Sequence, residues 1–344
     1  MGVAGIAAVA VLASACTPGA SIIGFTGPNG AQARPWTVNE PGVAVGSVID
    51  GGTSQAFTMD VATGQLQVLP PIPTQADFPA GGTVADARDI NDAGDLLVGN
   101  ANDAAAPSDN AAGDVAVAVD LADGHVTRLD CPAFTEIGRG LVTDDGLIVC
   151  GDHLLDERTG QAMAVPMPDG CNGVVAKVTD AGLVVGYCTA GTSPLFVTDR
   201  ATGLSATFGD DLGITPSPSN VQYLGSFTET GYLIGTTIDG TLFVYSLQGT
   251  TATRLDLGPF DVLPSVGYAI DANGVMSVGA QLPNDGGNGI FDYSVTTHEV
   301  RGHQSDLDPM RIATPMGRNT SGQIVGFVVN PAPGIAYGAF RSPG

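Results

Sequence analysis

The sequence predicts an all-β fold: a seven-bladed β-propeller of four-stranded antiparallel blades, closed by the N-terminal segment pairing with the last blade. Three observations predict it: a turn-and-strand pattern that recurs seven times, apolar runs that suit buried strands, and an unpartnered apolar segment near the N-terminus. The composition agrees, because 49 glycines, 23 prolines, 14% charged and 43% hydrophobic residues describe a turn-rich chain with ample core material. Intrinsic disorder is excluded as the main state.

The repeated pattern has polar residues before a glycine, then a mostly apolar run, then a second glycine. Polar residues that tolerate left-handed backbone, followed by glycine, are what a tight hairpin turn requires. The closing glycines lie between 35 residues (Gly151 to Gly186) and 53 residues (Gly46 to Gly99) apart. The seven copies are NEPGVAVG (39–46), INDAGDLLVG (90–99), VTDDGLIVCG (142–151), VTDAGLVVG (178–186), FTETGYLIG (227–235), IDANGVMSVG (270–279) and NTSGQIVG (319–326).

The run after each turn is continuously apolar, whereas a half-exposed strand would alternate between polar and apolar residues. A strand buried on both faces is therefore indicated. Most copies are followed by a second strand, a second glycine turn and a short final strand, as at residues 55–60, 63–64 and 66–69. Each repeat is predicted to be four antiparallel strands, and repeats of this length are typical of propeller blades rather than of a β-helix or a β-sandwich.

The two ends of the chain are predicted to complete one blade together. After the last copy the chain offers strands only at residues 323–327 and 336–341, which leaves no room for a fourth strand. The segment SIIGFT (21–26) is a short apolar strand with no partner of its own. We expect it to pair with the last blade, so that the ring has no open edge.

The first sixteen residues read as an export signal. An apolar run at residues 2–12 is too short for a membrane span, which needs about 20 apolar residues. The LASAC sequence (12–16) resembles the lipobox of bacterial lipoproteins, which implies that Cys16 is lipidated; the alternative is a plain secretory peptide cleaved near Ala15. The expected organisation is a signal peptide (1–15), a lipid-anchored segment (16–34) and the propeller (35–344). We expect the protein to be anchored to the bacterial cell membrane, facing outward into the periplasm or the extracellular space.

The four remaining cysteines are Cys131, Cys150, Cys171 and Cys188, and they predict two disulfides, because an even number is typical of exported disulfide-bonded chains. Three connectivities are possible. The hairpin turn near Asp180 places Cys188 almost opposite Cys171, which favours that bond, and Cys131–Cys150 follows by elimination. A metal site is disfavoured, because no C-x-x-C pair is present.

Several motifs resemble the HAF repeat of exported bacterial proteins. They are ARDIN (87–91) with Gly94 and VG (98–99), together with QAF (55–57) and GAF (338–340). Other copies depart from the pattern, with PLF (194–196), TLF (241–243) and GIF (289–291). The resemblance covers roughly residues 36–340. It implies an exported, propeller-like array, and it implies no catalytic residues, because the family has no agreed ones.

The charge balance limits the possible partners. With 35 acidic against 12 basic residues, the formal net charge of −23 repels nucleic-acid phosphates and anionic lipid headgroups. We therefore expect no nucleic-acid partner, contact with the membrane only through the N-terminal lipid, and a monomer. The expected partner is an extracellular protein, peptide or glycan.

The sequence contains no recognisable catalytic motif, since a G-x-S-x-G elbow, a phosphate loop and H-E-x-x-H are all missing. His298 and His303 are interpreted as a surface pair at the outer edge of the sixth blade. The acidic residues within 89–95 could bind Ca²⁺, but the hairpin turn requires the same residues. We therefore expect no cofactor, metal ion or catalytic residue.

Three functions remain open. The preferred one is a non-enzymatic surface scaffold or binding module that uses the loops at one mouth of the propeller. The second is a hydrolase or lyase with convergent carboxylates, which a cluster of carboxyl groups of raised pKa at one mouth would favour. The third is a lectin-like sugar- or metal-binding propeller. A partner is expected to touch the long inserts at residues 74–85, 100–114, 210–221 and 284–289.

Overall fold

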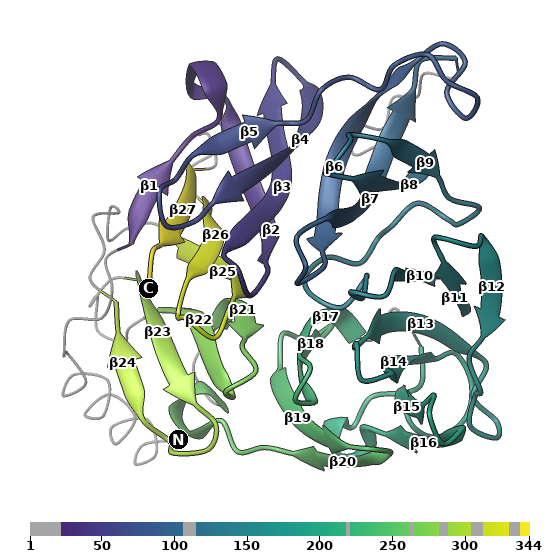
Figure 1. Cartoon of the computed structure of the whole chain (residues 1–344). Coiled ribbons are helices and arrows are strands. Elements are labelled where there is room, and N and C mark those ends of the chain that lie inside the picture. Colours follow the sequence, from purple (N-terminus) through teal and green to yellow (C-terminus); the bar gives the residue numbers. More distant parts are fainter. Residues whose placement is uncertain are drawn as a thin grey trace.

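The chain forms seven antiparallel sheets arranged in a ring about a common axis (Figure 1). The computed structural model describes residues 22–105, 115–217, 221–261, 265–281, 288–303, 312–329 and 338–344. The predicted all-β, seven-bladed propeller is confirmed. In the described residues the helices are the short η1 (Pro28–Gly30), η2 (Asp210–Leu212) and η3 (Gly258–Asp261), and none is long and apolar enough to cross a membrane.

The blades follow the order of the sequence. Blade one is β2 (Gln32–Val38), β3 (Val43–Asp50), β4 (Thr53–Asp60) and β5 (Leu66–Val68), and blade two is β6 (Gly82–Ile90), β7 (Leu96–Asp103), β8 (Val115–Asp120) and β9 (Val126–Arg128). Blade three is β10 (Leu147–Cys150), β11 (His153–Asp156) and β12 (Gln161–Ala164), and blade four is β13 (Gly173–Val178), β14 (Leu183–Cys188), β15 (Leu195–Asp199) and β16 (Leu204–Phe208). Blade five is β17 (Val221–Phe227), β18 (Tyr232–Thr237), β19 (Leu242–Gln248) and β20 (Thr251–Arg254). Blade six is β21 (Ser265–Ile270), β22 (Val275–Gln281), β23 (Asn288–Ser294) and β24 (Val300–Gly302). Blade seven is β25 (Ile312–Arg318), β26 (Ile324–Val329), β27 (Gly338–Ser342) and β1 (Ile23–Phe25).

Seven tight turns, one in each repeat copy, explain the polar-then-glycine pattern. In every turn the glycine N–H donates to the carbonyl three residues earlier, at 2.9 to 3.1 Å, and the glycine φ lies between +73° and +93°. The first turn residue accepts an N–H from the following strand, as Asn39 Oδ1 does from Val43 (2.8 Å) and Thr143 Oγ1 from Leu147 (2.9 Å). Residues with a Cβ rarely adopt such a φ, so the turn requires glycine.

In blades one, two, four and seven the closing glycine of the repeat is required for a different reason, which is a bulge in the neighbouring inner strand. The register of β6 against β7 shifts between Ala87 and Asp89, next to Gly99. A Cβ at Gly99 would lie 2.1 Å from the Asp86 carbonyl oxygen, and one at Gly46 would lie 2.1 Å from the Arg34 carbonyl oxygen. The bulged strand therefore leaves no room for a side chain.

The ring closes as predicted, through the chain's own N-terminal strand. Strand β1 pairs antiparallel with β27, and Gly24 faces Phe340. Residue 21 of the predicted strand and residues 330–337 lie outside the described residues. Blade one begins at Gln32, slightly before the predicted boundary at residue 35, because β2 pairs with β3 from that residue onward.

Blade three departs from the predicted four strands. Its inner strand is reduced to an isolated bridge between Val142 and Ile148, and only β10, β11 and β12 form its sheet. The irregular segment at residues 131–142, which we call the axial segment, takes the place of that strand. The apolar core lies largely between blades, since one cluster combines Val45 of blade one with Val84 and Leu97 of blade two.

Candidate functional site

Neighbouring turns are hydrogen-bonded to one another around one end of the ring. In blades one to five the second turn residue is acidic, and its carboxylate accepts a backbone N–H from the turn of the preceding blade. The N···O distances are 3.0 Å for Thr320 to Glu40, 3.0 Å for Glu40 to Asp92, 2.8 Å for Ala93 to Asp144, 2.7 Å for Asp144 to Asp180 and 3.3 Å for Ala181 to Glu229.

Blades six and seven use other groups at the same positions. Their second turn residues are Ala272 and Thr320. Thr230 donates its hydroxyl to the Ala272 carbonyl at 2.7 Å, and Arg318 Nε lies 2.8 Å from Asp271 Oδ2. The ring of contacts is therefore complete. An acidic second turn residue occurs only in blades one to five, and blade six contributes the carboxylate of its first turn residue, Asp271.

Arg139 of the axial segment lies among these carboxylates. Its guanidinium donates to Glu40 of blade one and to Asp92 of blade two, and its carbonyl accepts the Phe227 N–H of blade five at 3.3 Å. A residue that touches blades one, two and five must lie near the propeller axis. We call this group the acidic mouth, and its members are Glu40, Asp92, Asp144, Asp180, Glu229 and Arg139.

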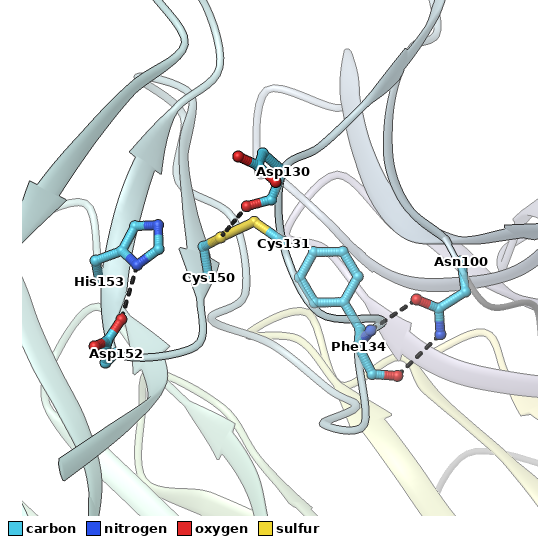
Figure 2. Close-up of a disulfide and its surroundings, with 7 residues drawn as sticks. All are labelled: Asn100, Asp130, Cys131, Phe134, Cys150, Asp152 and His153. Atoms are coloured by element: carbon cyan, nitrogen blue, oxygen red, sulfur yellow. Dashed lines mark hydrogen bonds and ion pairs between the residues drawn. A yellow bond between two sulfur atoms is a disulfide. The ribbon is translucent and has the colours of Figure 1, made fainter. Parts of the chain in front are cut away.

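Buried polar contacts hold the axial segment in place. Asn100 of β7 bonds both backbone groups of Phe134, accepting its N–H at 2.7 Å and donating to its carbonyl at 2.9 Å (Figure 2). Lys177 of β13 is fully buried and donates to the carbonyls of Ile137 (2.6 Å) and Gly138 (2.8 Å). These contacts replace the strand ladder that blade three lacks.

The inner end of the axial segment is fixed by a buried carboxylate. Asp89 Oδ2 of β6 accepts the N–H groups of Gly140 (2.9 Å) and Leu141 (2.7 Å). Burial raises the pKa of Asp89 to about 6, against the opposing charge of Lys177. Burial also lowers the pKa of Lys177 to about 8. Both side chains form hydrogen bonds with the backbone of the axial segment, and Lys177 is buried from solvent.

Among the described residues, two carboxyl groups of the acidic mouth, Asp180 and Glu229, form no salt bridge, although Arg139 lines the same recess. Burial, helped by the negative charge of Asp180, raises the pKa of Glu229 to about 7. Burial and the charges of Asp144 and Asp92 raise the pKa of Asp180. Glu40 behaves oppositely: although burial opposes it, hydrogen bonds from Thr320 and Arg139 lower the pKa of this carboxyl. Arg139 therefore neutralises one side of the mouth and leaves the other side negative.

The mouth is shallow. The recess lined by Asp92, Arg139, Asp180 and Glu229 has a volume of about 10 Å³, room for roughly one water molecule. Within the described parts of the chain, no three histidine, cysteine, aspartate or glutamate side chains are placed to hold a metal ion. The arrangement suits the charged tip of a side chain laid on the surface.

The structure joins the cysteines in the pairs that the sequence analysis favoured. Cys131 is bonded to Cys150 with Cα atoms 5.3 Å apart (Figure 2), and Cys171 to Cys188 with Cα atoms 5.0 Å apart. The sequence pattern could not place Cys131 on a strand opposite Cys150, because Cys131 lies in the irregular axial segment. Cys16, the predicted lipidation site, lies outside the described residues.

The two histidines of blade six are each engaged separately. His298 Nδ1 lies 2.6 Å from the Tyr293 hydroxyl, and His303 Nε2 lies 3.0 Å from Asp292 Oδ2. Asp292 also binds Arg318 of blade seven at 2.8 Å. Although burial opposes it, the hydrogen bond from His303 and the charge of Arg318 lower the pKa of Asp292. His303 thus joins a buried contact between two blades, whereas the sequence analysis placed it at the surface.

The acidic residues within 89–95 differ in their roles: Asp95 accepts a hydrogen bond from Asn91 within the turn (2.8 Å), whereas Asp89 and Asp92 also bind the axial segment. Asn91 Oδ1 accepts the N–H groups of Gly94 (3.0 Å) and Leu96 (3.0 Å), and Asp92 serves the mouth. The sequence analysis missed Arg139, Asp180 and Glu229 as site residues. The recurrence of an acid at the second turn position was a visible signal for the carboxylates, whereas nothing in the sequence marks Arg139.

Comparison with solved structures supports the fold alone. The chain is similar to the RRP9 WD40 repeats, with a TM-score of 0.54, 10% identity and coverage of 93% of this chain and 97% of that one. It is also similar to an oligogalacturonate lyase in complex with manganese, with a TM-score of 0.52, 10% identity and coverage of 95% and 98%. No protein-family model and no curated protein sequence matches the chain. The chain is therefore a seven-bladed propeller built like WD40 and lyase propellers.

Proposed function

We propose that this protein is an exported binding module that captures a basic segment of an extracellular protein or peptide at its acidic mouth. The observation that carries the proposal is the pair Asp180 and Glu229, whose carboxyl groups line one recess and have raised pKa values. Among the described residues neither forms a salt bridge, because Arg139, which shares the recess, is ion-paired with Glu40 and Asp92. A bound ammonium or guanidinium group would supply the missing charge.

The shape and charge of the mouth favour a side-chain cation over other ligands. The recess of about 10 Å³ is far below the roughly 300 Å³ at which enclosed small-molecule sites begin. The overall net charge of −23 steers basic partners toward the protein and repels acidic ones. A lysine or arginine tip needs no deep pocket, because its stem can remain on the surface.

The test is binding of a lysine-rich peptide to the purified mature chain at low salt, measured by calorimetry. Glu229→Gln together with Asp180→Asn should weaken binding about tenfold, because removing each charge costs part of a surface ion pair. Glu299→Gln is the matched control, because Glu299 is an exposed carboxylate paired with Arg301 in the outer part of blade six. Equal affinity in all three proteins, or preference for a glutamate-rich peptide, would refute the proposal.

A second candidate, a hydrolase or lyase, is favoured by one observation. A carboxyl group with a pKa of about 7 is suited to general acid–base work near neutral pH, and Glu229 has that property. The shallow recess argues against it. Screening polysaccharide and peptide substrates with the wild type and Glu229→Gln separates the two: turnover that the substitution abolishes would establish catalysis.

The cellular location of the protein and its relation to the HAF-repeat family are also part of the proposal. The LASAC sequence ending at Cys16 supports lipid anchoring, the HAF-like motifs support an exported propeller family, and two disulfides suit an oxidising compartment. Expression of the full chain in a bacterial host, followed by membrane fractionation, tests the anchor. Cys16→Ser should move the protein from the membrane to the soluble fraction, and an unchanged distribution would exclude lipidation of Cys16.

A further inference from the structure

We infer that the groove between blades one and two is a second part of the binding surface, and that it takes the apolar side chains of an extended peptide whose basic residue sits in the acidic mouth. The inference rests on the proposed function and extends it from a charge preference to a sequence preference. It concerns a surface that the mouth itself does not include.

The groove is the right size and chemistry for apolar side chains. Its volume is about 670 Å³, within the range of specific ligand sites. Its apolar lining comes from both blades: the partly buried Val43 and Leu121 form its walls, and the core residues Leu69, Val84, Val119 and Val126 form its floor. Pro70, Pro71 and Pro73 are exposed along one side. Such a groove removes apolar surface of a ligand from water without a conformational change.

The groove continues from the acidic mouth. Val43 directly follows the turn that carries Glu40, and Gly94 closes the turn that carries Asp92. Both residues line the groove, so its inner end begins at the turns that supply two of the mouth's carboxylates. A chain lying in the groove is therefore directed toward Arg139 and its acidic neighbours.

Charge complementarity identifies the occupant. None of the groove's lining residues is basic, and its one charged lining residue is Asp123. Asp120 lies in the same turn as Asp123. An acidic ligand is disfavoured along the whole path, whereas a peptide with a lysine or arginine beside apolar residues matches it.

The outer edge of blade one suits an extended backbone. Strand β5 is the terminal strand of its sheet, and Gln67 of that strand lines the groove. An extended peptide presents alternate side chains to one face, so a chain that crosses β5 near Gln67 can place every second side chain in the groove. We therefore commit to an extended peptide with the order basic residue then alternating apolar residues, or the reverse.

Ala122→Trp tests the groove without disturbing the core. Ala122 is an exposed lining residue in the turn after β8, and its N–H donates to Asp120 Oδ1 at 2.8 Å. Ala201→Trp is the matched control, because Ala201 is also exposed, lies in the equivalent turn of blade four and donates to Asp199 Oδ1 at 2.9 Å. Circular dichroism and thermal unfolding show whether both variants are folded.

The experiment measures fluorescence anisotropy with three labelled eight-residue peptides on the full mature chain. The first has one lysine followed by alternating leucines, the second replaces the leucines with serine, and the third replaces the lysine with glutamine. We expect the first peptide to bind most tightly. Ala122→Trp should weaken it about tenfold or more and leave the serine peptide unchanged, while Ala201→Trp should have no effect on either.

The outcomes separate the two proposals. If Ala122→Trp binds the leucine peptide as the wild type does, the groove is not used and the inference is overturned, while the mouth can still stand. If the glutamine peptide binds as tightly as the lysine peptide, the proposed function fails and only the groove is supported. A concentration-dependent dimer in sedimentation that Ala122→Trp abolishes would assign the groove to a second copy and overturn the peptide assignment.

Discussion

Blades two and three have the same repeat motif but complete it differently. In blade two, β6 runs alongside β7 over its whole length, with the bulge that forces glycine at residue 99. In blade three the corresponding Gly151 has φ +66°, and no atom lies closer than 3.9 Å to the position of an added Cβ. The closing glycine of the repeat is therefore required by close packing in blade two and by left-handed backbone in blade three.

The difference shows what replaces a missing strand. The axial segment of blade three is held by a disulfide at Cys131 and by buried side chains of blades two and four, namely Asn100, Asp89 and Lys177. Because the segment is not a strand, its Arg139 can reach the axis and contact blades one and two. The irregular blade thus supplies the one cation of the acidic mouth.

The largest expected effect separates the two glycines. Gly99→Ala should destabilise the protein by about 4 kcal/mol or prevent folding, because its Cβ would overlap the Asp86 carbonyl oxygen. Gly151→Ala should cost about 1 kcal/mol, the penalty for left-handed backbone alone. Urea unfolding of both variants measures the difference, and equal losses would show that blade three packs like blade two.

The two disulfides should contribute similarly to stability but not to binding. Each closes a loop of comparable separation, 19 and 17 residues, so replacing either cysteine pair with serine should cost about 3 kcal/mol. Only the change at Cys131 and Cys150 releases the start of the axial segment. That variant should bind a basic peptide more weakly, whereas the variant at Cys171 and Cys188 should bind normally; the opposite order would separate the axial segment from the mouth.

Two asparagines of β7 provide a finer comparison. Asn100→Ala leaves both backbone groups of Phe134 unpaired in a buried site, which should cost about 2 kcal/mol. Asn102→Ala removes a side chain whose buried Oδ1 has no hydrogen-bond partner among the residues that the structure describes, so its cost should be close to zero. Thermal unfolding of the pair gives the result, and similar midpoints would mean that Phe134 is held by other contacts.

The last comparison is a pH dependence of stability that arises from Lys177. Its folded pKa of about 8 lies below the ordinary value of 10.5, so the unfolded chain binds more protons between these values. Stability should therefore rise with pH from about 8 to 10 relative to Lys177→Met, which lacks the group. A difference between the two proteins that stays flat over this range would show that the lysine is not desolvated.

The propeller, its seven repeat copies and the closing strand could be predicted from the sequence, because each depends on short segments of neighbouring residues. Polar-glycine turns, apolar runs and an orphan strand such as β1 are visible without coordinates. The loss of the inner strand in blade three was not visible, because it depends on contacts between distant residues such as Lys177 and Ile137. Arg139 was missed for the same reason: its partners Glu40 and Asp92 belong to other blades.

The most direct test of the acidic mouth is the number of protons exchanged when a lysine-rich peptide binds, obtained by calorimetry in buffers of different ionisation enthalpy. Glu229, with a pKa of about 7, is about half protonated at pH 7, and a neighbouring cation lowers that pKa. Binding should release up to about half a proton at pH 7 and almost none at pH 9. Binding with no proton release at pH 7 would show that the cation does not sit beside Glu229.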